Sequence, residues 1–323
     1  MDFESNSHHS YQNSIPYLYL NSREKLLSNL RSNSICKRYS RYKGLPIRYA
    51  GGKSLAVGYI LENIPDGITT LISPFFGGGS VEIACAKELG MKVVGYDIFD
   101  ILCNYWQVQL SNPRELANRI EMWSPQSDIY LKVKKRLHQH WCDEKKINNK
   151  LELAAHYWFN HNLSYGPGFL GWMSKIYQNE YRVKRLIDKV RQFRCPGLSV
   201  QQGNFEEILP KYKKSFLYCD PPYYLNDSKM FRGIYPQRNF PVHHKGFNHI
   251  LLRDFLKKHK GGFVLSYNDC STIRNWYSDY KIIDVSWQYT LGQGETRIGK
   301  NRIKNGTESY IKKSHEILII KTH

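Results

Sequence analysis

The chain has 323 residues, of which 41% are apolar, and its formal net charge is +19. The apolar content supports a sizeable core and excludes global disorder, while the excess of Lys and Arg favours a polyanionic partner, most simply nucleic acid. No apolar run approaches the about 18 residues of a membrane span, and the N-terminus lacks the basic region and apolar stretch of a secretory signal, so we expect no membrane association.

Residues 1–45 are predicted to form an N-terminal arm outside the core. Residues 1–21 are rich in Ser, Asn, His and Tyr, a composition that indicates a poorly ordered segment. A short amphipathic helix is expected from near Ser22, because leucines recur there at helical spacing. Residues 31–48 then carry basic side chains and no acidic one. This charge run suits either phosphate contact or a solvated surface.

The stretch Ala50-Gly51-Gly52-Lys53 precedes a predicted helix at 54–63. Its two glycines permit close approach to the helix N-terminus, where free N–H groups can meet an anion, and Lys53 adds a positive charge. An ordinary loop before a helix explains the same residues equally well. The spacing of a phosphate-binding P-loop is absent.

The next elements form a strand, a glycine turn, a helix and a second strand that ends in an acid. The strands are predicted at 69–75 and 92–96, the helix at 80–90 with Ser80 as its cap, and Asp97 follows the second strand. This order is typical of a nucleoside-binding βαβ unit, in which the acid bonds ribose hydroxyls. A plain glycine-rich turn would explain the glycines but not the acid.

Residues 111–195 interrupt this alternation of strands and helices. The segment is predicted to be mainly helical, with helices at 113–121, 128–141, 150–160 and 179–193. We expect residues 159–169 to form a loop in which Asn160, Asn162 and Ser164 contact base edges. The segment is strongly basic, so we interpret it as an inserted DNA-reading module. A helical lid or a dimer interface is the alternative.

The alternation resumes with a strand at 198–205 and a strand that ends at Asp220. Pro221 and Pro222 have no N–H to donate, so the chain leaves the sheet there. The turn is expected to place the Asp220 carboxylate, the Pro221 carbonyl and the Tyr223 ring at the sheet edge where open α/β sheets bind ligands. A simple surface turn is the alternative, since Asp and Pro favour turns.

These three groups suit an attack by an exocyclic amine of an aromatic base. Such an amine is a poor nucleophile, because its lone pair is delocalised into the ring. Two acceptors bonded to its hydrogens, Asp220 and the carbonyl of Pro221, would turn the lone pair out of the ring plane. The ring of Tyr223 could stack on the base and hold it.

Beyond this turn lies a long basic loop at 225–247, of the kind that often forms a lid over a site. The remaining elements are predicted as a helix at 248–259, a strand at 262–269, and an antiparallel pair of strands at 280–289 and 314–322 joined by a basic loop at 292–308. The seven cysteines are odd in number and show no CxxC pair, so we expect reduced thiols in a cytoplasmic protein. His243 and His244 have no supporting acid or cysteine beside them, and we assign no metal.

The order of these motifs resembles the Dam-type DNA adenine-N6 methyltransferases, the alpha group of the amino-methyltransferases. The resemblance covers residues 46–323. Ala50–Lys53 is similar to the family's N-terminal cofactor motif, Pro74–Gly79 to its FxGxG cofactor loop, Asp97 to its ribose-binding acid, and Asp220–Tyr223 to its catalytic DPPY motif. Cofactor motifs first, target-recognition region in the middle and DPPY after it define the alpha arrangement.

The resemblance implies a Rossmann-like α/β fold with a twisted, mostly parallel seven-stranded sheet and an antiparallel last strand. It implies a catalytic domain formed by residues 46–110 and 196–323, a helical target-recognition domain at 111–195, and S-adenosylmethionine as methyl donor. The implied catalytic residues are Asp220, Pro221, Pro222 and Tyr223. The implied cofactor-binding residues are Tyr49, Lys53, Phe75, Gly77, Gly79, Asp97, Asn204, Phe205 and Asp220. Asn204 departs from the family's usual Asp, so we expect a weaker contact with the cofactor adenine there.

We therefore expect site-specific transfer of a methyl group to adenine N6 in double-stranded DNA, with the target base flipped out of the stack. Cytosine-N4 methylation uses the same amine chemistry and is the main alternative. A methyltransferase acting on RNA or a protein amide, and a catalytically dead DNA-binding protein on the same scaffold, are further alternatives. The resemblance also leaves room for a restriction-modification system with a cognate restriction endonuclease as partner.

Overall fold

The structure, a computed structural model, describes residues 14–31, 38–224, 247–285 and 316–322. Its centre is a seven-stranded sheet with the strand order β3-β2-β1-β4-β5-β7-β6. All neighbouring strands are parallel except β7, which runs antiparallel to both β5 and β6. The strands are β1 (Thr70–Ser73), β2 (Lys92–Asp97), β3 (Leu198–Gln202), β4 (Phe216–Cys219), β5 (Phe263–Asn268), β6 (Lys281–Val285) and β7 (Glu316–Lys321). The predicted α/β class and the antiparallel last strand are confirmed.

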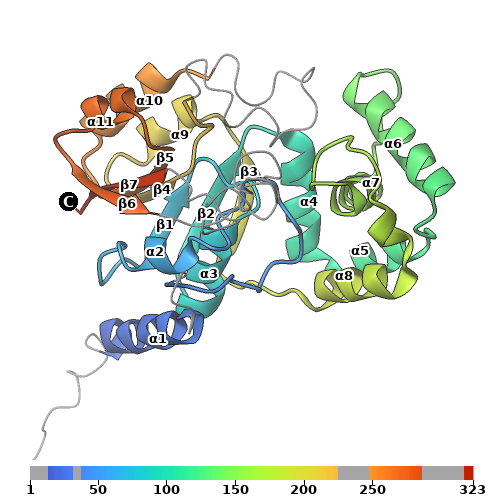
Figure 1. The fold of residues 1–323 in the computed structure, drawn as a ribbon, viewed down its shortest axis with the longest axis horizontal. Coiled ribbons are helices and arrows are strands. Elements are labelled where there is room, and N and C mark those ends of the chain that lie inside the picture. The colour runs from blue at the N-terminus through green and yellow to red at the C-terminus, as the bar shows by residue number, and fades with distance from the viewer. Residues whose placement is uncertain (1–13, 32–37, 225–246, 286–315, 323) are drawn as a thin grey trace, which may run out of the picture.

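The sheet is covered by helices on both faces (Figure 1). No helix among the described residues is both long and apolar enough to span a bilayer. The helices are α1 (Ser14–Leu30), α2 (Val57–Leu61), α3 (Ser80–Leu89), α4 (Asp100–Ser111), α5 (Pro113–Glu121), α6 (Ser127–Trp141), α7 (Lys150–Leu163), α8 (Glu180–Gln192), α9 (Phe205–Lys211), α10 (His249–Lys258) and α11 (Ser271–Trp276), with a 3₁₀ turn at Lys175–Gln178.

Two cores lie on opposite faces of the sheet because strand side chains alternate between the faces. In β4, Tyr218 joins the core formed with α1 to α8, whereas Leu217 and Cys219 join the core formed with α9, α10 and α11. In β7, Leu318 and Ile319 divide in the same way. The central strands are therefore buried on both sides, as their near-continuous apolar sequence predicts.

Helices α5 to α8 gather on one side of the sheet, and α4 lies between them and the strands (Figure 1). The helices expected at 113–121, 128–141 and 179–193 are confirmed to within a residue or two at each end. The expected loop at 159–169 is wrong in its first part, because α7 continues to Leu163. The apolar run from Tyr157 to Phe159 packs in the core on all sides, so the helix has no exposed polar boundary there.

The N-terminal segment is partly built into the fold. The helix expected from near Ser22 begins at Ser14, and its Leu26 and Leu30 are buried in the core next to α2 and α3. Tyr39 and Tyr42 are buried as well. The predicted poor order of the first residues, the basic lid at 225–247 and the basic loop at 292–308 lie largely outside the described residues.

Candidate active site

The carboxyl ends of β1 to β4 bring most of the predicted site residues to one edge of the sheet. β1 lies between β2 and β4, so the chain winds outward from β1 in both directions. Ligands of open α/β sheets bind at such a switch point, outside the carboxyl ends of the strands. The loop after β1 carries Gly77, β2 ends in Asp97, and Asp220 follows β4 directly. These residues come from separate parts of the sequence and meet because the strands are parallel.

Lys53 and Asp220 form a buried ion pair at this edge. The Lys53 ammonium lies 2.7 Å from one Asp220 carboxylate oxygen and 2.8 Å from the other. The side chain of Lys53 is 5% exposed and that of Asp220 is 20% exposed. Burial raises the pKa of Asp220 above its usual value, and the Lys53 charge works against that rise. Lys53 therefore favours the ionised carboxylate, a role that its predicted part in cofactor binding did not include.

The Tyr223 side chain is held from two sides. Its hydroxyl donates a hydrogen bond to Glu316, at the start of β7, and its ring packs against Tyr267 with centroids 6.2 Å apart. The Lys53 ammonium lies 4.9 Å from the centre of the same ring. Since Tyr223 is only 8% exposed, its ring is positioned by the sheet rather than by solvent. Pro221 is buried and Pro222 half-buried, and neither belongs to a strand.

Asn268, the last residue of β5, fixes the chain just beyond the motif. Its side-chain oxygen accepts from the backbone N–H of Tyr224 at 2.8 Å, and its nitrogen donates to the carbonyl of the same residue at 2.8 Å. Together with Glu316 it anchors the turn to the far half of the sheet. Sequence reasoning missed both roles, although a polar residue at the end of a buried apolar strand is a usable signal for Asn268 and Glu316 alike.

The glycine loop after β1 is attached to Asp97. Gly77 and Gly79 adopt positive φ angles of 49° and 63°, which favour glycine. The Gly77 N–H donates to one Asp97 oxygen at 2.8 Å, and the Phe99 N–H donates to the other at 3.0 Å. Burial raises the pKa of Asp97, and these backbone donors counter the rise. Ser80, the predicted cap of the next helix, is instead its first residue, and Gly79 is the cap residue.

An aromatic corner lies beside this loop. The ring centroids of Phe75 and Phe205 are 5.7 Å apart, and Phe247 lies 5.0 Å from Phe205. The side-chain oxygen of Asn204 accepts from the Glu206 N–H at 3.3 Å and so caps α9. This cap gives Asn204 a structural task beside its expected contact with the cofactor. The corner offers flat apolar faces at the carboxyl edge of the sheet.

Tyr49 belongs to a segment that α7 holds in place. The ring of Tyr49 stacks on His161 with centroids 5.6 Å apart and lies against the backbone of Gly77 and Gly78. The backbone N–H of Arg48 donates to the Asn162 side chain at 2.9 Å, and His161 hydrogen-bonds the Arg48 carbonyl at 2.9 Å. The entry to the Lys53 motif is thus bound to the C-terminal turn of α7.

The amides expected to contact bases have internal roles instead. Asn160, Asn162 and Ser164 are at most 1% exposed. The Asn160 side chain accepts from the Leu170 N–H at 2.7 Å and donates to the Tyr130 hydroxyl at 2.9 Å. The Ser164 hydroxyl accepts from the Gly168 N–H at 2.9 Å. These side chains shape the loop after α7, so the expectation that they contact DNA is wrong.

Burial of His161 predicts a pH-dependent loss of stability. Burial lowers the pKa of His161 to about 3, whereas an unfolded chain protonates it near 6.5. As the pH falls below about 6.5, the unfolded state binds the extra proton, so we expect stability to fall by up to about 1.4 kcal/mol per pH unit from this group. Urea unfolding at pH 7, 6 and 5 measures the slope.

The variant His161→Gln is the control, since glutamine retains a donor near the Arg48 carbonyl but does not titrate. Its stability should depend less steeply on pH than that of the unchanged protein. Some slope will remain, because burial also lowers the pKa of His156 and His259. Equal slopes for the two proteins would contradict the assignment.

The gathered groups fit S-adenosylmethionine chemically. Asp97 is a half-buried carboxylate suited to ribose hydroxyls, and the Phe75–Phe205 corner offers apolar surface for a flat base. Asp220 lies at the same edge of the sheet, where its carboxylate is paired with Lys53. A further carboxyl group, Glu82, is buried nearby and accepts from the Ser73 hydroxyl at 2.6 Å. Burial raises the pKa of Glu82 to about 8, so it adds little negative charge at neutral pH.

Comparisons with known proteins support this assignment. The family model described as D12 class N6 adenine-specific DNA methyltransferase matches residues 49–291. No curated protein matches the chain. Among solved structures, the chain is similar to precorrin 8w decarboxylase from Methanobacterium thermoautotrophicum, with 8% identity and a TM-score of 0.31 over 83% of this chain and 89% of that one. A similarity this loose has no bearing on fold or function.

Proposed function

Because the chain belongs to the D12 class of N6 adenine-specific DNA methyltransferases, we propose that its methyl transfer takes place at Asp220 and Tyr223. Membership makes the protein an adenine-N6 DNA methyltransferase with S-adenosylmethionine as donor. The observation that supports the site is the buried Lys53–Asp220 pair beside the Tyr223 ring at the carboxyl edge of β4. A buried ion pair at the ligand-binding edge of such a sheet usually has a functional role.

In this proposal the residues around Asp220 act on the adenine amine. The Asp220 carboxylate and the Pro221 carbonyl each accept a hydrogen bond from one of its two N–H groups. These hydrogen bonds turn the nitrogen lone pair out of the ring plane. Lys53 keeps Asp220 ionised, and the Tyr223 ring stacks on the base. The Lys53 ammonium lies over that ring in the structure, so the lysine side chain must move off the ring when the base stacks there.

The cofactor residues divide the remaining tasks. When bound, S-adenosylmethionine supplies an electrophilic methyl group. Asp97 holds the ribose hydroxyls, and the Phe75–Phe205 corner with Asn204 holds the adenine. Gly77 packs against the ring of Tyr49 and Gly79 against that of Phe76, so glycine at both positions lets the cofactor loop pack closely on these rings. These roles follow the family motifs, from which Asn204 alone departs.

We also propose that residues 111–195 contact double-stranded DNA through the loop at 164–173. The loop is closed by a bridge between Ser164 and Met173, and the Tyr165 N–H donates to the Trp172 carbonyl at 2.6 Å. Tyr165 is 59% exposed and Trp172 is 74% exposed. The Lys134 ammonium lies 4.3 Å from the centre of a Trp172 ring. An exposed aromatic beside a cation suits contact with bases and phosphates.

The replacement Trp172→Ala should weaken DNA binding without unfolding the protein. Base–aromatic contacts are worth about 1–3 kcal/mol, so we expect the Kd for duplex DNA to rise by roughly 5- to 100-fold. Fluorescence anisotropy with labelled DNA at fixed salt measures this change. Tyr181→Ala removes a similarly exposed aromatic from α8 and serves as the matched control. An equal loss of DNA affinity in the two variants would contradict a specific role of the loop at 164–173 in DNA binding.

The reaction itself is tested by incubating the protein with labelled S-adenosylmethionine and unmethylated mixed-sequence DNA, followed by digestion to nucleosides. N6-methyladenine is the expected product. N4-methylcytosine would retain the site and overturn the target base. Cofactor binding without any labelled product would point to a catalytically dead DNA-binding protein.

A further inference from the structure

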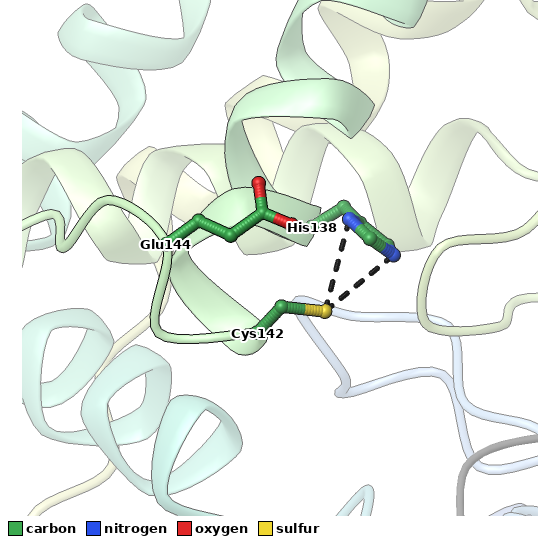
Figure 2. Close-up of side chains that lie close together, drawn as sticks. All are labelled: His138, Cys142 and Glu144. Carbon is green, nitrogen blue, oxygen red and sulfur yellow. Dashed lines mark hydrogen bonds between the residues drawn. The ribbon is translucent and has the colours of Figure 1, made fainter.

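A second group of side chains with metal-ligand chemistry lies in the helical module, outside the site described above (Figure 2). His138 and Cys142 are one turn apart at the end of α6, and Glu144 follows in the turn that leaves the helix. All three side chains are exposed, and their ligand atoms lie within 4.8 Å of one another. It is the one group of this kind found among the described residues.

The separation between the Cys142 sulfur and the nearer ring nitrogen of His138 is close to that of two ligands of a tetrahedral metal ion. The Cys142 sulfur lies 3.6 Å from Nε2 of His138 and 3.8 Å from its Nδ1. Zinc–sulfur and zinc–nitrogen bonds of about 2.3 and 2.05 Å at a tetrahedral angle separate the two ligand atoms by about 3.5 Å. A thiolate, an imidazole and a carboxylate are the ligands that zinc-class ions accept, and two negative ligands balance a divalent charge.

The backbone that carries these ligands is already ordered. The Arg136 guanidinium donates to the carbonyls of Lys145 and Lys146 at 2.6 and 2.7 Å. The buried side chain of His140 accepts from the Ile147 N–H at 2.9 Å. The turn after α6 is therefore fixed at both ends, and binding an ion needs adjustment of side chains rather than folding of a loop.

We propose that His138, Cys142 and Glu144 bind a zinc-class divalent ion, with water completing the tetrahedron. Figure 1 places α6 on the outer side of the module, away from the strands that carry Asp220. The turn at 142–147 is already hydrogen-bonded to α6, so the ion would add a further link between them at a distance from the site of methyl transfer. The expectation of no metal rested on the absence of CxxC pairs and of an acid or cysteine beside His243 and His244. It did not consider a His and a Cys four residues apart.

The test is a titration of the metal-stripped full chain with Co²⁺. This ion binds at zinc sites, and a thiolate ligand gives it a charge-transfer absorption band. We expect the band to saturate at one equivalent and to disappear on addition of Zn²⁺. Cys142→Ser should abolish the band. Glu144→Gln should weaken Co²⁺ binding by at least about tenfold, the smallest loss that even outer-shell changes cause.

Cys270→Ser is the matched control, because it removes a half-exposed thiol while leaving the group intact. Cys270 directly precedes α11, which Figure 1 shows on the other side of the molecule from α6. This variant should leave the band unchanged. The ligands are exposed, so none of these variants is expected to unfold, and circular dichroism checks that point. Absence of a thiolate band in the unchanged protein, or a band that persists in Cys142→Ser, would overturn the proposal.

Discussion

Replacing Asp220 by alanine is expected to lower the rate of methyl transfer by about 10²–10³-fold, the usual effect of removing one group that stabilises a transition state. The alanine side chain cannot accept a hydrogen bond from the adenine amine, so the nitrogen lone pair stays delocalised into the ring. DNA binding should change little, because the proposed DNA contacts lie on the loop at 164–173. Single-turnover rates with saturating DNA and cofactor measure the loss.

The same replacement leaves Lys53 buried without its carboxylate, which costs about 3–5 kcal/mol of stability in comparable pairs. Loss of activity could then reflect unfolding alone. The double variant Asp220→Ala with Lys53→Met removes both charges and should recover most of the stability while staying inactive. Recovery of methyl transfer in the double variant, or an equal loss of DNA binding and transfer in the single one, would contradict the role of Asp220.

Replacing Lys53 by methionine should shift the pH dependence of methyl transfer to higher pH. Burial already raises the pKa of Asp220, and the Lys53 charge opposes that rise. Without the charge the pKa rises further, and the ionised fraction falls about tenfold for each unit by which it exceeds the pH. We expect the rising limb of the pH–rate profile to move to higher pH than in the unchanged protein, measured as a full pH–rate profile.

Lys53→Arg preserves the charge and is the matched variant for this experiment. Its pH–rate profile should stay close to that of the unchanged protein, although the larger guanidinium group is expected to lower the rate of methyl transfer. A methionine variant whose profile does not move would show that Lys53 has no influence on Asp220. Higher activity at neutral pH would show instead that the lysine only blocks the carboxylate.

Much of the fold was predictable from local patterns in the sequence. Apolar runs that end in Asp97 and Asp220 marked the central strands, and the double proline marked the end of β4. The amphipathic helices α5 and α8 were found nearly to the residue, because each has one buried face. Parallel strands then force the residues at their carboxyl ends together, which is why Gly77 and Asp97 were expected near each other and are hydrogen-bonded.

The wrong or missed predictions for polar side chains share one cause. The sequence does not show whether a polar side chain has a hydrogen-bond partner inside the protein. Asn160 and Asn162 resembled base-reading amides, yet their partners are Tyr130 and Arg48, distant in the sequence. The position of Glu316 at the start of an apolar strand is a signal, but its partner Tyr223 lies 93 residues away, so the sequence does not show which residue it contacts. Lys53 and Asp220 are 167 residues apart, so no local sequence pattern predicts that they form a pair.

The position of β7 has a consequence for how the enzyme is made. β7 is the last strand described, yet it inserts between β5 and β6, which the ribosome has already released. Until it emerges, on the order of seconds later, the nascent chain carries Lys53, Asp220 and Tyr223 but has no Glu316 to align the tyrosine. It also presents the unpaired edge of β5, a template for association with other chains. We therefore expect a chain that ends before Glu316 to carry Lys53, Asp220 and Tyr223 without the contact that holds the tyrosine.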